Sequence, residues 1–187
     1  MNTSGTNISK NHLVWMDMEM TGLDPEHDTI LEIATIITDG QLNTIAEGPV
    51  LVIHHNRQAL DNMNEWCVRQ HGESGLNKRV LDSDTTLAEA EAATLEFIQR
   101  YVPESNSPLC GNSIHQDRRF LVRYMPNLEA WLHYRNIDVS SIKELTRHWY
   151  PRLKSPAKSG NHLALDDVRD SIVELRFYRE KVFIPSP

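Results

Sequence analysis

Three apolar stretches within the first 53 residues constrain the fold of this chain more than any other feature. Residues 12–18 form a run typical of a buried strand, and residues 30–38 are rich in isoleucine and threonine. Asp39-Gly40 follows at once, and this dipeptide favours a hairpin turn before a third stretch over residues 41–53. The sequence therefore predicts three consecutive strands that pair antiparallel.

Helical periodicity replaces the strand pattern in most of the remaining chain. The clearest example is Thr86–Tyr101, where apolar residues recur at helical spacing and Pro103 lies just beyond. Further helices are predicted over residues 63–70, 73–80, 117–124, 128–134 (after a break near Pro126) and 163–182, and short strands over residues 109–112 and 137–139. Ser140 or Ser141 is expected to cap another helix ending at Trp149. This order predicts an α/β fold, a mixed β-sheet flanked by α-helices.

Length and composition set broad limits. A chain of 187 residues predicts a single domain over residues 1–187. Residues 1–11 are polar and lack the apolar segment of a signal peptide, so a flexible tail is expected there. No run approaches the roughly 18 apolar residues of a membrane span. Cys67 and Cys110 fit no zinc pattern and are expected to be free thiols, as in a cytoplasmic protein.

The net charge of −7 argues against a protein that grips long nucleic acid, because such proteins neutralise many phosphates with lysine and arginine. A bound metal ion would still reverse the local field in a cleft. The charge balance therefore favours short anionic substrates.

Two carboxylates close the first predicted strand. Side chains alternate along a strand, so Asp17 and Glu19 share one face while Met16, Met18 and Met20 share the other. Paired carboxylates repel one another unless a cation lies between them, and Mg²⁺ or Mn²⁺ prefers such oxygen ligands. The pattern is equally compatible with two solvent-facing acids at a strand edge.

Three later residues have simple explanations when each is taken alone. Asp117 and Asp167 fit first-turn helix acids stabilised by the helix dipole, and His162 fits a surface histidine. Taken together with Asp17 and Glu19, they predict a divalent-metal site with a histidine that can accept a proton from water.

The joint pattern is more specific than its parts. Asp-x-Glu-x-Thr-Gly at residues 17–22, Asp117, and His-x-x-x-x-Asp at residues 162–167 resemble the DEDDh 3′→5′ exonuclease family, which has an RNase H-like fold. Further blocks are similar to the oligoribonuclease family within it, namely residues 15–25, 46–49, 110–114, 116–120, 134–135, 138–140 and 162–167. These blocks span nearly the whole chain after residue 11.

This resemblance implies a reaction. Two divalent cations, Mg²⁺ or Mn²⁺, would bind the attacking and leaving oxygens, with Asp17 shared by both ions and Glu19, Asp117 and Asp167 completing their shells. His162 would act as general base. The expected activity is 3′→5′ degradation of very short RNA oligomers, especially diribonucleotides, to nucleoside 5′-monophosphates. A DEDDh exonuclease acting on longer single-stranded RNA or DNA is the nearer alternative, and a catalytically silent nucleotide-binding module is another.

The resemblance also implies a substrate site. Leu23 would separate two bases, Trp66 would stack on one of them, and His71 would lie near the substrate. Residues that would close over the 5′ end of the substrate are Ser113, Tyr134, Arg135 and Ser140, with Tyr134 and Arg135 supplied by the partner subunit of a homodimer. Simpler alternatives are a core aromatic for Trp66, a loop histidine for His71 and a surface cation for Arg135.

Overall fold

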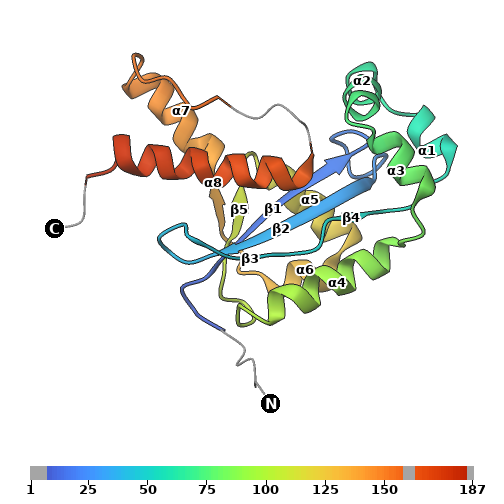
Figure 1. Cartoon of the computed structure of the whole chain (residues 1–187), viewed down its shortest axis with the longest axis horizontal. Helices are drawn as coiled ribbons and strands as arrows, with labels where there is room; N and C mark the ends of the chain where they lie inside the picture. The colour runs from blue at the N-terminus through green and yellow to red at the C-terminus, as the bar shows by residue number, and fades with distance from the viewer. Residues whose placement is uncertain (1–7, 158–162, 185–187) are drawn as a thin grey trace.

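A mixed β-sheet lies between two groups of helices in the computed structural model, which describes residues 8–157 and 163–184 (Figure 1). The strands are β1 (Leu13–Met20), β2 (Ile30–Thr38), β3 (Thr44–Glu47), β4 (Leu51–Val52), β5 (Leu109–Gly111) and β6 (Asn136–Asp138). The helices are α1 (Arg57–Asp61), α2 (Glu65–Glu73), α3 (Leu76–Asp82), α4 (Leu87–Gln99), α5 (His115–Tyr124), α6 (Pro126–Trp131), α7 (Val139–Trp149) and α8 (Ala164–Lys181).

Strand order in the sheet is β3-β2-β1-β5-β6, with β4 also pairing with β2. The first three strands pair antiparallel, whereas β5 and β6 run parallel to β1. The predicted α/β fold and its antiparallel opening are therefore confirmed. The predicted third strand is divided into β3 and β4. Gly48 still donates its N–H to the Thr35 carbonyl oxygen of β2, but Pro49 has no N–H to donate and interrupts the pairing.

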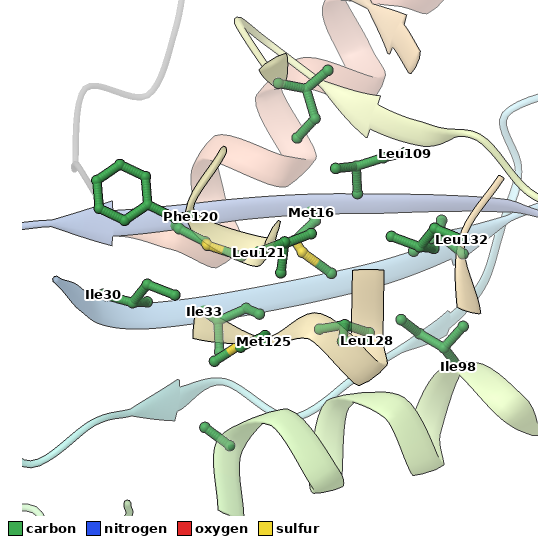
Figure 2. Packing of buried hydrophobic residues seen from close by; sticks show 14 of the residues in the cluster. Met16, Ile30, Ile33, Ile98, Leu109, Phe120, Leu121, Met125, Leu128 and Leu132 are labelled. Atoms are coloured by element: carbon green, nitrogen blue, oxygen red, sulfur yellow. The ribbon is translucent and has the colours of Figure 1, made fainter. Parts of the chain in front are cut away.

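The two faces of the sheet bury different residues. Met16, Met18 and Met20 of β1 pack with apolar residues of α4, α5 and α6, and Figure 2 shows Met16 beside Leu121 and Leu128 in this layer. Trp15 packs on the opposite face in a second cluster that includes Val168 and Ile172 of α8. The alternation leaves Asp17 and Glu19 together on the face opposite the methionines, as the sequence predicted, and this face carries α8.

Most predicted helices are confirmed, with corrections at their ends. Pro126 begins α6, where its missing N–H costs nothing, and this helix ends at Trp131 before the predicted limit. Asp138, not Ser140 or Ser141, caps α7, because its carboxylate accepts the N–H of Ser140. Helix α1 was not predicted at all, since its five residues are too few to show a period.

Other expectations concern the chain ends and the cysteines. Cys67 and Cys110 are buried free thiols. Among the described helices, none is long and apolar enough to cross a membrane. Residues 1–7 of the predicted tail lie outside the described residues, while Ser9 and Lys10 hydrogen-bond to Tyr101 and Asn106.

Candidate metal centre and substrate cavity

Three of the predicted carboxylates converge where β1 meets the start of α8. One oxygen from each of Asp17, Glu19 and Asp167 lies within 4.8 Å of the others, and all three side chains are half-buried. Asp17 and Glu19 come from the sheet, whereas Asp167 lies in the first turn of α8. Packing of α8 across the sheet thus brings together Asp17 and Asp167, which lie about 150 residues apart in the sequence.

Electrostatics favour a cation among these groups. Burial, together with the charges of Asp167, Glu32 and Asp117, raises the pKa of Glu19 to about 8, while the charge of Arg79 acts in the opposite direction. A divalent cation would remove this repulsion, and three carboxylates are the donor set that hard cations prefer. The residues therefore fit a divalent-metal centre.

Asp117 is the fourth predicted carboxylate and lies beside this group rather than within it. It is buried in the first turn of α5, and its Oδ1 accepts the N–H of Met18 at 3.0 Å. Burial raises the pKa of Asp117 to about 7, although the backbone N–H groups bonded to it act in the opposite direction. Its charge also reaches Glu19, so the two carboxyls belong to one electrostatic site.

A cavity of about 430 Å³ opens beside these carboxylates. It is lined by Asp17, Met18, Glu19, Met20, Gly22, Leu23, Asn64, Trp66, Cys67, His71, Ser113, His115, Gln116 and Asp117. Leu23 is 64% exposed and Trp66 is 53% exposed, although both are apolar. Two exposed apolar side chains on the wall of one cavity are suited to hold the flat faces of bases.

Leu23 is held in place by contacts of its backbone and its neighbours. Asp28 accepts the Thr21 hydroxyl and the Asp24 N–H, each at 2.9 Å, and so closes the loop after β1. Arg119 of α5 donates to the Leu23 carbonyl oxygen at 3.1 Å. The apolar side chain is therefore presented to the cavity by an ordered loop.

Helix α2 and its cap supply another part of the cavity wall. Asn64 caps this helix by accepting the Cys67 N–H, which places Trp66 in the first turn. His71 is buried, its Nε2 donates to the Met20 carbonyl oxygen at 2.9 Å, and its Nδ1 lies 3.8 Å from Glu19 Oε2. The alternative interpretations of Trp66 as a core aromatic and His71 as a loop histidine are wrong.

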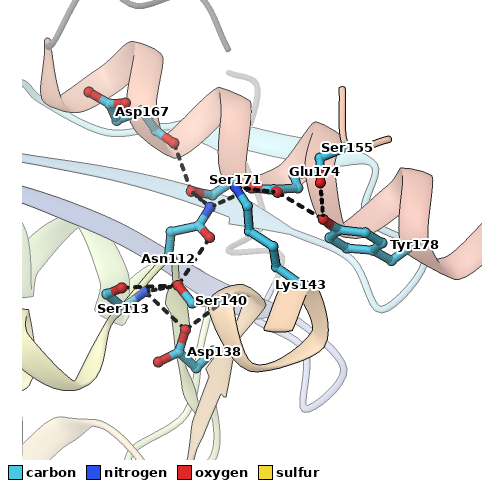
Figure 3. A network of polar contacts seen from close by, with 10 residues as sticks. All are labelled: Asn112, Ser113, Asp138, Ser140, Lys143, Ser155, Asp167, Ser171, Glu174 and Tyr178. Atoms are coloured by element: carbon cyan, nitrogen blue, oxygen red, sulfur yellow. Dashed lines mark hydrogen bonds and ion pairs between the residues drawn. The ribbon is translucent and has the colours of Figure 1, made fainter. Parts of the chain in front are cut away.

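Ser113 lies on the cavity wall with a left-handed backbone, φ 52°. Its N–H donates to Asp138 Oδ1 at 2.9 Å and to Ser140 Oγ at 2.7 Å, contacts drawn in Figure 3. Such a conformation is costly for a residue with a side chain, and these bonds hold it. Ser140 thus reaches the site through Ser113.

Several residues of this region were missed in the sequence. His115 and Gln116 line the cavity, and Asp138 fixes Ser113. Asn64 had a readable signal, since asparagine directly before a helical segment is a common cap. Asp138 had none, because its role depends on contacts with a segment 25 residues away.

Tyr134 and Arg135, two of the predicted substrate residues, are exposed and do not line this cavity. Tyr134 is 72% exposed, stacks on His133 and lies beneath the Arg135 guanidinium. His162 lies outside the described residues.

Comparisons with known proteins agree with this geometry. The exonuclease family model matches residues 14–175. Proteins named oligoribonuclease are similar throughout: that of Pseudomonas syringae pv. syringae is 60% identical over 95% of this chain and 99% of its own length, and that of Halorhodospira halophila is 61% identical over 93% and 96%.

Among solved structures, zinc-bound E. coli exonuclease I with single-stranded DNA matches with a TM-score of 0.72 at 18% identity, over 93% of this chain. Exonuclease I of Methylocaldum szegediense matches with a TM-score of 0.68 at 23% identity, over 91% of this chain. The chain spans only 41% of each of those longer proteins, so this likeness concerns the fold, which is RNase H-like.

The fold and the acidic centre define a metal-dependent exonuclease. With the family model matched along most of its length, the chain belongs to the exonuclease family.

Proposed function

We propose that this protein is a 3′→5′ exoribonuclease that degrades very short RNA, above all diribonucleotides, to nucleoside 5′-monophosphates. The observation that carries the proposal is the convergence of Asp17, Glu19 and Asp167 beside a cavity walled by Leu23 and Trp66. Identity of about 60% to proteins named oligoribonuclease supports the choice of RNA and of short chains.

Two divalent cations, Mg²⁺ or Mn²⁺, would be held by Asp17, Glu19, Asp117 and Asp167 and would neutralise negative charge that develops on the phosphate oxygens. Asp17 would be the carboxylate shared by both ions. His162 would accept the proton of the attacking water, since an imidazole with an ordinary pKa near ~6.5 suits this role at neutral pH.

The remaining residues would bind and orient the substrate. Leu23 would separate the two bases while Trp66 stacks on one of them, and each such stack is worth about 1–3 kcal/mol. His71 holds the Met20 carbonyl oxygen by hydrogen bonding and so orders the strand end against which the terminal nucleotide would lie. Ser113 and Ser140 would lie toward the 5′ side.

We also propose a homodimer in which Tyr134 and Arg135 reach the partner's site and close it at the 5′ end. Their exposure and their absence from the lining of this chain's own cavity support a role in trans. A site closed at this end would select short chains. The protein would act as a single domain over residues 1–187, and its two free cysteines accord with a reducing cytoplasm.

The second candidate is an exonuclease for longer single strands, favoured by the fold shared with a protein solved with single-stranded DNA. A length series separates the two. RNA chains of two to about seven nucleotides, labelled at the 5′ end, and matched DNA chains are incubated with Mn²⁺ and with EDTA. Fastest turnover of the diribonucleotide, with monophosphate product and no reaction in EDTA, is expected. Faster turnover of the longer chains would favour the second candidate.

A further inference from the structure

Helix α8 starts without a cap of its own. A helix leaves its first four N–H groups without intrahelical partners, and side chains just before the helix often accept one of them. Leu163 occupies this position and makes no side-chain cap. The acceptor comes instead from the sheet, because Glu32 Oε2 of β2 accepts the Ala164 N–H at 3.2 Å in a buried contact.

Glu32 is brought there by the strand register. Glu32 lies opposite Glu19, next to an irregularity in the β1–β2 ladder, and is only 1% exposed. The irregularity places Ile30 in the cluster beneath α5 and α6 but leaves Glu32 on the face that carries α8. Glu32 is the one charged residue of a fully buried strand, and a carboxylate is costly to bury unless partners surround it.

Arg79 of α3 is the charged partner. Its Nη1 forms an ion pair with Glu32 Oε1. The Arg79 side chain is 37% exposed, whereas the Glu32 side chain is only 1% exposed, so Arg79 brings a positive charge from the edge of the site to a buried carboxylate. The two oxygens of Glu32 therefore connect α3 on one side with the first turn of α8 on the other.

The first turn of α8 carries Asp167, whose N–H donates to Leu163 within the same turn. We infer that Glu32, held by Arg79, is a positioning residue that serves as a remote cap for α8 and sets the place of Asp167 against Asp17 and Glu19. The inference rests on the proposed function, because it assigns Glu32 to the metal-dependent reaction at that site.

The test compares metal binding in variants without relying on turnover. Mn²⁺ is titrated while the Tm is followed, first for the unaltered protein and then for Glu32→Ala, Glu32→Gln and Arg79→Met. Loss of an outer-shell partner lowers metal affinity by about 10–100-fold, and this loss is expected for Glu32→Ala. Glu32→Gln keeps an oxygen for Ala164 but presents an amide NH2 to Arg79, whereas Arg79→Met keeps both Glu32 oxygens but removes the charge that holds them. Each of these two variants is expected to lose Mn²⁺ affinity, by less than Glu32→Ala loses.

The chain offers a matched control on the same helix. Glu174 of α8 is also buried, and it pairs with Lys143 at 3.1 Å while accepting an N–H from Asn112 (Figure 3). Glu174→Gln therefore removes a comparable buried charge about two turns from Asp167. It is expected to lower the Tm while leaving the Mn²⁺ midpoint unchanged.

Kinetics on a diribonucleotide provide the second readout. Glu32→Ala should lower kcat strongly and change KM little, since Leu23 and Trp66, which would bind the bases, lie on elements other than α8. Equal Mn²⁺ midpoints for Glu32→Ala and the unaltered protein would overturn the inference and leave the proposed function standing. An unaltered protein that neither shifts its Tm with Mn²⁺ nor turns over RNA would instead reject the proposed function. Should Glu32→Ala fail to fold, Arg79→Met and Glu32→Gln decide the question by the same midpoints.

Discussion

Glu19 shows at the scale of one residue how function opposes stability. Burial and neighbouring negative charge raise its pKa to about 8, so the carboxyl stays protonated at neutral pH. Unfolding would expose the carboxyl to water, where it ionises at an ordinary pKa. The metal-free fold therefore carries a cost at neutral pH that a cation removes.

The first prediction follows from that cost. Glu19→Gln should make the metal-free protein more stable by roughly 1–3 kcal/mol near neutral pH, because an amide of the same shape is neutral without having to take up a proton on folding. The same variant should lose most of its activity. Thermal unfolding in EDTA measures the gain, and Glu96→Gln, which alters an exposed ion pair on α4, is the control. A lower Tm for Glu19→Gln would mean that its carboxylate makes favourable contacts without metal.

The second prediction concerns pH. The pKa values of Glu19 and Asp117 are raised to about 8 and about 7. A raised pKa in the folded state stabilises the protein below the unfolded pKa, and this contribution is lost as pH rises through the folded value. Stability in EDTA should therefore fall between about pH 5 and pH 8, where ordinary carboxylates no longer titrate.

Metal affinity should rise with pH over the same range, since a cation binds the deprotonated carboxylates and displaces their protons. Calorimetric Mn²⁺ titrations in buffers of different ionisation enthalpy measure the protons released. Affinity that stays constant from about pH 6 to about pH 8 would show that the carboxyls are already ionised in the metal-free protein.

At the scale of elements, local patterns predicted the strands and helices well where the pattern was long. Helices α4 and α8 and strand β2 were placed within about two residues, because periodicity and capping act along the chain itself. The cap of α7 was assigned to serine instead of Asp138, since several polar residues compete for that position. Helix α1 and the division of the third strand depend on packing, and no local pattern encodes them.

The loop after β1 yields the third prediction. A Cβ at Gly22 would lie 2.4 Å from Asp28 Oδ2, and that carboxylate is already fixed by Thr21 and Asp24. Gly22→Ala should therefore displace the loop and move Leu23 away from the cavity. Loss of one base contact, about 1–3 kcal/mol, corresponds to a KM raised roughly fivefold or more for a diribonucleotide.

Gly40→Ala is the matched control for this loop, because the nearest atom to its Cβ would be the Asn11 carbonyl oxygen at 3.6 Å, an ordinary contact. Its kinetics should equal those of the unaltered protein. An unchanged KM for Gly22→Ala would show that Leu23 keeps its place or does not contact the bases.

At the scale of the whole molecule, the sequence predicted the three carboxylates that converge but not the distances between them. Asp17 and Glu19 share a face because strands alternate, which a reader of the sequence can derive. The approach of Asp167 depends on how α8 crosses the sheet, and the remote cap from Glu32 depends on a strand register with an irregularity. Such contacts join segments more than 100 residues apart and leave no periodic trace in the chain.

The proposed homodimer gives the last prediction. If Tyr134 serves the partner's site, the Tyr134→Ala and Asp17→Ala variants should each be weakly active or inactive alone, yet active when co-expressed. In a mixed dimer, the subunit with the Tyr134 substitution keeps Asp17 and receives Tyr134 from its partner, so one site is complete. Random assembly makes half the dimers mixed, which gives about a quarter of the unaltered activity. Co-expressed Asp17→Ala and Glu19→Gln are the control. Each subunit supplies both of these residues to its own site, so a mixed dimer contains no complete site. Activity is measured as monophosphate released from a diribonucleotide. Recovery in the first pair alone supports a shared site, whereas no recovery would mean that Tyr134 does not complete the partner's site.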